Sequence, residues 1–285
     1  MVRVLYLDTM MLRPWLLLAF VPVVVPAQGP NRLPDHASIE LQRRLAPLGR
    51  QLSIAFVFPR EPKPAGRGSY SYDPIAADRY DDADRYVDLF IEELSKYPES
   101  FLKASNIKRV LFVQNIALGQ HKRAAFPDTR GEDILFDVSS VRSDRYARHV
   151  IHHEIYHMLE DDWNGSAFYK DPNWAMLNES GFEYGAGGAA FQNGAFWEFN
   201  HPQTGFINVY ATSGLEEDKA EVWAILFVPD SWKIVEPMLG SDPVLRAKVA
   251  YMREFGRSKS AAMNVEYWSD VVQGPSNKPV GQKRG

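Results

Sequence analysis

Three residues suited to metal and proton chemistry stand together in the segment His153-Glu154-Ile155-Tyr156-His157. Residues four apart in an α-helix lie on nearly the same side, one turn along the axis, so the imidazoles of His153 and His157 can bind one metal ion. Glu154 flanks both rings and can act there as a general base. The spacing predicts a zinc site on a helix, and the alternative is a core helix that is rich in histidine by chance.

The helix that positions these side chains is expected over about residues 144–160. Ser143 and Asp144 are candidate N-cap residues. The side opposite the histidines is apolar, as a helix with its back in a core requires, and consists of Ala147, Ile151, Ile155, Met158 and Leu159. The metal face and the core face are therefore separate.

A catalytic zinc site uses three protein ligands and keeps one open position. The metzincin extension, in which a glycine and a third histidine follow closely, is excluded because Glu160 and Trp163 occupy those two positions. In the gluzincin alternative the third ligand is a glutamate on a separate helix downstream. Such a helix is expected from Ser213 to about Phe227.

Three glutamates, Glu216, Glu217 and Glu221, compete for the third position. Ser213 and Glu216 fit a capping box, which would fold the Glu216 side chain back onto the backbone and ranks it lowest. Glu217 and Glu221 lie one turn apart, so one could bind zinc while the other accepts the outer N–H of a ligand histidine. The spacing leaves the choice between these two open.

The segment 205–221 resembles a sequence pattern of a known protein family. Gly205-Phe206-Ile207-Asn208-Val209-Tyr210-Ala211 and then Glu217-Asp218-Lys219-Ala220-Glu221 resemble the Gly-Phe-x-x-x-Tyr-Ala…Glu-x-x-Ala-Glu pattern of gluzincin peptidases similar to the anthrax lethal factor catalytic domain. The resemblance implies Glu217 as the zinc ligand, Glu221 as the group behind a ligand histidine and Tyr210 as the group facing the reacting oxygen. It covers about residues 85–228. Lys219 stands where an aromatic residue is commoner, on a face expected to be exposed.

The fold class expected on this basis is α+β, a zincin-like domain. A small mixed sheet would pack on the histidine helix, followed by a mostly helical C-terminal part. Strands are expected over 52–58, 108–114 and 133–138, and helices over 38–48, 83–96 and within 237–255. A strand directly before such a helix is often the sheet edge to which an extended peptide pairs. The glycine-rich segment 163–205 is expected to wall the cleft, although any single residue in it could equally belong to a surface loop.

The predicted activity is that of an exported zinc metallopeptidase acting on a peptide or protein substrate, with Glu154 as base and Tyr210 stabilising the oxyanion. The alternative is a catalytically inactive zinc-containing binding protein of the cell envelope. A closed structural zinc site is disfavoured because the ligand set leaves one position open. The net charge of −4 and a pI near 6.0 give no reason to expect a nucleic-acid partner.

The first 27 residues have the pattern of a secretory signal. Arg13 precedes a short apolar run that ends at Ala27, after which cleavage is expected. A membrane anchor is the weaker alternative because the run is short and contains three prolines, so no stable membrane insertion is expected after cleavage. The predicted location is secreted or periplasmic, with a metallopeptidase domain over 37–272 and a disordered tail over 273–285. The chain has no cysteine and hence no disulfide.

Three further histidines are weighed against the site. His149 is about 12 Å along the helix axis from His157, too far to share one zinc ion with it, and is interpreted as a residue behind the ligands or on the surface. His152 points away from His153 and is expected to meet a neighbouring loop. His201 lies in the predicted cleft wall and could touch substrate.

Overall fold

The computed structural model describes residues 32–66, 70–188 and 198–273. They belong to a compact unit that begins at Arg32. The predicted signal segment 1–27 lies outside the described residues, as does the predicted tail after Gln273. None of the described helices has the length and apolar composition needed to cross a bilayer.

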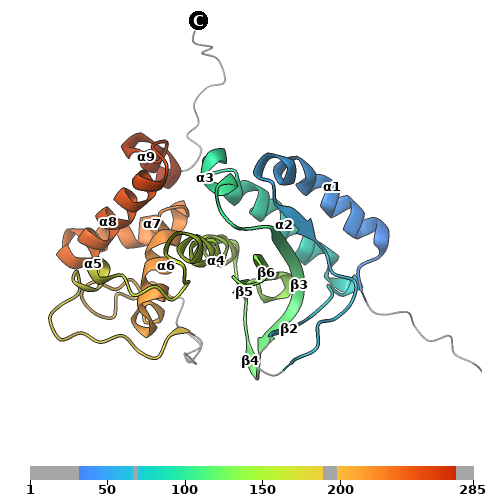
Figure 1. The fold of residues 1–285 in the computed structure, drawn as a ribbon, viewed down its shortest axis with the longest axis horizontal. Helices are drawn as coiled ribbons and strands as arrows, with labels where there is room; N and C mark the ends of the chain where they lie inside the picture. Colours follow the sequence, from blue (N-terminus) through green and yellow to red (C-terminus); the bar gives the residue numbers. More distant parts are fainter. Residues whose placement is uncertain (1–31, 67–69, 189–197, 274–285) are drawn as a thin grey trace, which may run out of the picture. The chain divides into compact units, whose positions relative to one another are not determined.

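The described strands form a six-stranded mixed sheet. Its main part has the order β1-β3-β6-β5, in which β1, β3 and β6 run parallel and β5 runs antiparallel to β6. β2 and β4 pair antiparallel with the second half of the long strand β3 (Figure 1). The bounds are β1 Ala55–Val57, β2 Tyr70–Asp73, β3 Arg109–Leu118, β4 His121–Lys122, β5 Ala125–Asp128 and β6 Asp133–Asp137.

Alternate residues of the central strands divide between two apolar clusters. Val110, Phe112 and Phe136 enter the large core that the sheet shares with the helices, whereas Leu111 and Leu135 enter a small cluster with β2. This division is what the two-residue period of a strand requires. The helices therefore cover one face of the sheet, and the other face carries the small apolar cluster that includes Tyr70 of β2.

The N-terminal half supplies the helices beside the sheet, α1 (Asp35–Leu52), α2 (Tyr80–Leu94) and α3 (Glu99–Lys103), with short 3-10 turns at Ala77–Arg79 and Val138–Ser140. Helix α4 (Asp144–Asn164) packs against β5, β6 and α2 on one side and against α6 on the other. The part of the chain after α4 is mostly helical, and α6 to α9 are orange to red in Figure 1. It contains α5 (Pro172–Ala175), the turns η4 (Tyr210–Ser213) and η5 (Glu236–Gly240), α6 (Leu215–Ile225), α7 (Pro229–Val235), α8 (Pro243–Lys259) and α9 (Val265–Gln273).

The expected mixture of a small mixed sheet and a mostly helical C-terminal part is confirmed, but several boundaries were wrong. α1 continues through Gly49, where a helix end was expected. A Cβ at Gly49 would lie 2.8 Å from the Ile54 carbonyl oxygen, so this glycine permits a close approach rather than a stop. Strands β2, β4 and β5 and helix α9 lie in segments for which no strand or helix was expected.

The sheet edge was also misplaced. β6, the strand directly before α4, is paired on both sides, by β3 and by β5. β5 occupies the outer position of this part of the sheet. Its four residues include Pro127, a residue that strands tolerate mainly at edges.

The capping box at the start of α6 is absent. Gly214 is the N-cap residue of α6, and no side chain caps it. Ser213 ends the preceding 3-10 turn, and its buried hydroxyl has no hydrogen-bond partner in the described part of the chain. The turn places Ser213 one residue too early to cap the helix.

Candidate metal centre

Helix α4 brings the two histidines to the face that meets α6. The Ser143 hydroxyl accepts a hydrogen bond from the Tyr146 amide at 3.2 Å, as predicted for an N-cap. Gly165, with φ of 74°, ends the helix in the left-handed conformation. The predicted back of the helix, Ala147, Ile151, Ile155, Met158 and Leu159, is buried throughout.

His153, His157 and Glu217 converge on one point. The Nε2 atoms of His153 and His157 are 3.1 Å apart, and Glu217 Oε2 is 3.0 Å from the first and 3.4 Å from the second. Each of the three residues is at most 7% exposed. Residues 64 positions apart in sequence thus present three donor atoms to one small space.

The triangle of donor atoms fits a zinc ion. Tetrahedral zinc with bonds of about 2.0–2.1 Å to nitrogen and oxygen separates neighbouring ligand atoms by about 3.3 Å. The three observed separations of 3.0, 3.1 and 3.4 Å lie around that value. Two neutral imidazoles and one carboxylate are also a donor set that zinc accepts.

Electrostatics favour the ionised carboxylate that such a site needs. Burial raises the pKa of Glu217, but hydrogen bonds and charge interactions with His153 and His157 outweigh it and hold this pKa well below the ordinary value. Burial lowers the pKa of His153, whereas Glu217 and Glu221 raise it well above the ordinary value. Buried groups whose pKa values are shifted by close charged partners are common at functional sites.

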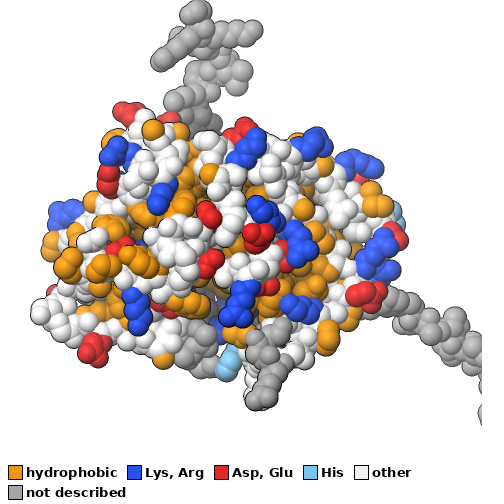
Figure 2. All heavy atoms as spheres, in the orientation of Figure 1, with side chains coloured by type: hydrophobic (Ala, Val, Ile, Leu, Met, Phe, Trp, Pro, Cys, Tyr) orange, Lys and Arg blue, Asp and Glu red, His pale blue; other side chains and the backbone are white. Residues whose placement is uncertain are grey.

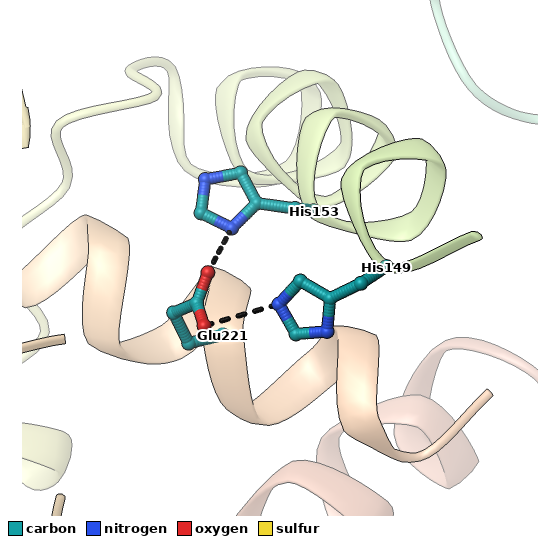
Figure 3. Close-up of side chains that lie close together, drawn as sticks. All are labelled: His149, His153 and Glu221. Carbon is teal, nitrogen blue, oxygen red and sulfur yellow. Dashed lines mark ion pairs between the residues drawn. The ribbon is translucent and has the colours of Figure 1, made fainter. Parts of the chain in front are cut away.

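Glu221 lies beside the triangle of donor atoms and contacts two histidines (Figure 3). Its Oε1 is 3.0 Å from His153 Nδ1, and its Oε2 is 3.0 Å from His149 Nε2. His149 is only 7% exposed, and neither of its ring nitrogens has hydrogen-bond geometry to a group among the described residues. His149 therefore lies inside, beside Glu221, and not on the surface. These atoms form a second buried group of potential metal-binding side chains, which shares His153 with the first.

Asn208 is a member of the site that the sequence did not single out. Its Nδ2 donates to Glu221 Oε2 at 2.6 Å, and its Oδ1 accepts the Ala211 amide at 2.8 Å. The side chain is completely buried. Asn208 therefore ties the turn that carries Tyr210 to Glu221. The only hint in the sequence was that Asn208 lies within the 205–211 pattern. That pattern accepts any residue at this position, so it did not single out Asn208.

Glu154 and Tyr210 lie beside the triangle. The Glu154 Oε2 atom is buried and has no hydrogen-bond partner in the described residues. Burial raises the pKa of Glu154, although His153 and His157 act in the opposite direction. The Tyr210 ring centre is 5.8 Å from that of His153. Burial and the carboxylates of Glu217 and Glu154 raise the pKa of Tyr210 far above its ordinary value, so its hydroxyl keeps its proton.

The expectation of an exposed Lys219 was wrong. Its side chain is fully buried, with Nζ 2.7 Å from Glu160 Oε1 and 3.3 Å from Asp171 Oδ2. Two carboxylates compensate the buried ammonium group. Lys219 thus joins α6 to α4 and to the residue that caps α5.

The other two histidines weighed from the sequence, His152 and His201, have structural partners. His152 is fully buried, with Nε2 2.7 Å from Glu93 Oε2 on α2 and Nδ1 2.9 Å from the Tyr97 hydroxyl in the turn between α2 and α3, so it meets this loop, as expected, and also a helix. His201 Nε2 is 2.8 Å from Asp242 Oδ2, at the N-cap of α8. No described contact brings either ring to the His153–His157–Glu217 triangle.

Comparisons with known proteins find a similar fold. No protein-family model matches the chain, and a search of curated proteins finds no match. A search of solved structures matches a protein from Bacteroides caccae described as a "putative zinc-binding metallo-peptidase", with a TM-score of 0.56 and 17% sequence identity. The match covers 84% of this chain and 92% of that chain. At this identity the likeness shows a shared fold.

Proposed function

We propose that this protein is a zinc-dependent metallopeptidase of the gluzincin type, with His153, His157 and Glu217 as its metal ligands. The observation that carries the proposal is the triangle of three buried donor atoms at 3.0–3.4 Å from one another. The three residues lie on α4 and α6, and both helices contribute apolar residues to the main core. The fold shared with a protein described as a zinc-binding metallo-peptidase supports the proposal.

Zinc at this position supplies a Lewis acid that polarises a peptide carbonyl and makes a water molecule acidic near neutral pH. Glu154 is the group that takes the proton of the attacking water. Burial raises the pKa of Glu154, and a more basic carboxylate is better able to take that proton before returning it to the leaving amine. Tyr210, which stays protonated, donates a hydrogen bond to the oxyanion that develops.

Glu221 orients the first ligand. A carboxylate at 3.0 Å from Nδ1 fixes the imidazole tautomer so that Nε2 presents its lone pair to the metal. Asn208 holds the same carboxylate from the other side. The substrate is a peptide or protein, and the outer side of β5 offers a strand to which an extended chain can pair. The apolar segment before Ala27 supports secretion or a periplasmic location.

Peptide cleavage with matched variants tests this proposal. The purified protein is incubated with a peptide library, with and without a zinc chelator, beside a Glu154→Gln variant. We expect cleavage by the parent only, loss of cleavage with chelator, and equal zinc content in parent and variant. If the parent binds zinc and cleaves no peptide, the alternative of a zinc-containing binding protein is favoured. Equal cleavage by parent and variant would show that Glu154 is not the base.

A further inference from the structure

Residues 185–188, here called the glycine strap, run directly beside the turn that carries Tyr210. The Gly185 amide donates to the Thr212 carbonyl at 3.0 Å, and the Gly187 amide donates to the Ser213 carbonyl at 2.6 Å. Just before the strap, the Tyr184 hydroxyl donates to Asp218 Oδ2 at 2.7 Å. The strap therefore runs along the η4 turn, and the Tyr184 hydrogen bond to Asp218 attaches the residue before it to α6.

The end of the strap touches two residues of the proposed site. A Cβ built on Gly188 would overlap Glu217 Oε1 and the Tyr210 hydroxyl oxygen, and would lie 2.6 Å from Glu217 Cδ. Gly187 has φ of 88°, a conformation that side chains disfavour. Glycine is thus required here for a steric reason, because the backbone lies directly on a ligand carboxylate and on the phenol.

Arg123 contacts the same point from the sheet side. Its Nη1 is 3.5 Å from the Gly188 carbonyl oxygen. The Arg123 backbone is fixed by its amide, which donates to the Ile116 carbonyl of β3 at 2.9 Å. The last residue of the strap therefore lies between the edge of the sheet and the η4 turn.

We propose that the glycine strap is an autoinhibitory segment that must leave its place before a peptide can reach the centre. This inference rests on the proposed function, since the strap covers the hydroxyl that Tyr210 would offer to the reacting oxygen. Two backbone hydrogen bonds and the Arg123 contact hold the strap, and its one side chain, Ala186, is exposed. A segment with so little buried apolar surface can open without disturbing the core.

An engineered disulfide tests whether the strap has to move. A Cβ at Gly185 would lie 3.4 Å from Ser213 Cα, and the chain has no cysteine of its own. In the double variant Gly185→Cys/Ser213→Cys, we expect oxidation to reduce peptide cleavage at least tenfold with zinc retained, and the reductant TCEP to restore it. The two single variants are the controls and should not respond to oxidation.

The outcomes separate this proposal from the proposed function. Cleavage at equal rates by the oxidised and reduced double variant would overturn the proposal while leaving the peptidase intact. Failure of the disulfide to form, read by mass spectrometry, would show that the strap does not lie beside η4. If the parent cleaves no peptide, the rate of zinc extraction by a chelator gives the readout, and we expect it to be at least threefold slower in the oxidised form.

A second variant acts in the opposite direction. Gly188→Ala prevents the strap from seating, so we expect at least threefold faster zinc extraction and higher kcat/KM than in the parent. Gly240→Ala is the matched control, because a Cβ at Gly240 meets no atom within 4 Å. A Gly188→Ala protein that retains zinc and cleaves more slowly than the parent would contradict autoinhibition, since the closed strap would then assist the reaction.

Discussion

Replacing Glu221 by glutamine isolates the role of the carboxylate beside the triangle of donor atoms. Glu221 faces three nitrogen atoms: His153 Nδ1 at 3.0 Å, His149 Nε2 at 3.0 Å and Asn208 Nδ2 at 2.6 Å. Both of its oxygens can accept hydrogen bonds, whereas a glutamine amide has one acceptor and one donor end. In either orientation, the substituted amide would turn an N–H toward a group that also donates.

The expected loss can be estimated from these contacts. If the amide N–H turns toward His153, it replaces the carboxylate oxygen that lies 3.0 Å from Nδ1, and the tautomer of this imidazole is no longer fixed. If it turns toward Asn208, the two amide groups repel each other. Removing such a partner of a ligand histidine typically weakens metal binding about 10–100-fold, or about 1.4–2.7 kcal/mol. We expect Glu221→Gln to bind zinc more weakly by that factor.

Competition with a chromophoric chelator measures this change, with zinc as the only added metal. Glu254→Gln is the control, since Glu254 is exposed and pairs only with Arg257 on the same helix among the described residues. A circular dichroism spectrum of each variant checks that the fold is retained. Equal zinc affinity in Glu221→Gln and the parent would refute the assignment of Glu221 as the group that orients His153.

Three further predictions concern the base and two buried ion pairs. Glu154→Gln should lower kcat by about 10²–10⁴-fold with zinc content unchanged, measured by peptide hydrolysis and metal analysis; a variant that loses zinc would contradict a role confined to proton transfer. Lys219→Met should cost about 3–5 kcal/mol in urea unfolding because it leaves Glu160 without its buried cation, whereas the exposed Lys233→Met should change stability little. Glu93 has a pKa lowered to about 2: burial raises it, but the hydrogen bond from His152 and the ion pairs with Lys96 and Arg148 prevail, whereas burial lowers the pKa of His152 to about 4 and leaves its ring neutral at pH 7. A depressed carboxyl pKa gives stability that is present above about pH 4.5 and is lost as the pH falls toward 2, so the gap of about 3 kcal/mol between parent and Glu93→Gln should narrow below pH 4.5. A gap that stays constant from pH 7 to pH 3 would contradict that reasoning.

The elements with strong local signals were predictable from the sequence. Helix α4 combines an N-cap serine with a continuous apolar back, and β3 begins with an apolar run bounded by polar residues. Both were expected close to their observed positions. The convergence of Glu217 with the α4 histidines agrees with the spacing of the downstream pattern, although its role as a ligand stays a prediction.

Features that depend on tertiary partners were not predictable. The surroundings of Lys219 follow from Glu160 and Asp171, which lie 59 and 48 residues away, so its sequence neighbours carry no signal of burial. The same holds for His152, whose partner Glu93 is on another helix. The role of a glycine was equally hard to predict from the sequence. Gly49 does not end α1: it lies inside this helix, close to the Ile54 carbonyl oxygen.

The short strands β4 and β5 show a further limit. They contain two and four residues, and neither has enough alternation to stand out from a polar, turn-rich segment. Their pairing with β3 and β6 determines them. The sheet edge could therefore be assigned only from the three-dimensional structure.

Figure 2 shows that charged side chains of both signs are interspersed over the face of the molecule seen there, which agrees with the small net charge of −4. On this face, such a mixture gives no large single-sign field for steering a polyanion.

Zinc stoichiometry in the parent and in ligand variants tests the central claim most directly. The protein is saturated with zinc, freed of loosely bound metal and analysed by mass spectrometry under native conditions, beside Glu217→Ala and the control Glu254→Ala. We expect one tightly bound zinc ion in the parent and the control, and its loss from Glu217→Ala. A parent that binds no zinc, or a Glu217→Ala variant that binds it as tightly as the parent, would contradict a centre built on His153, His157 and Glu217.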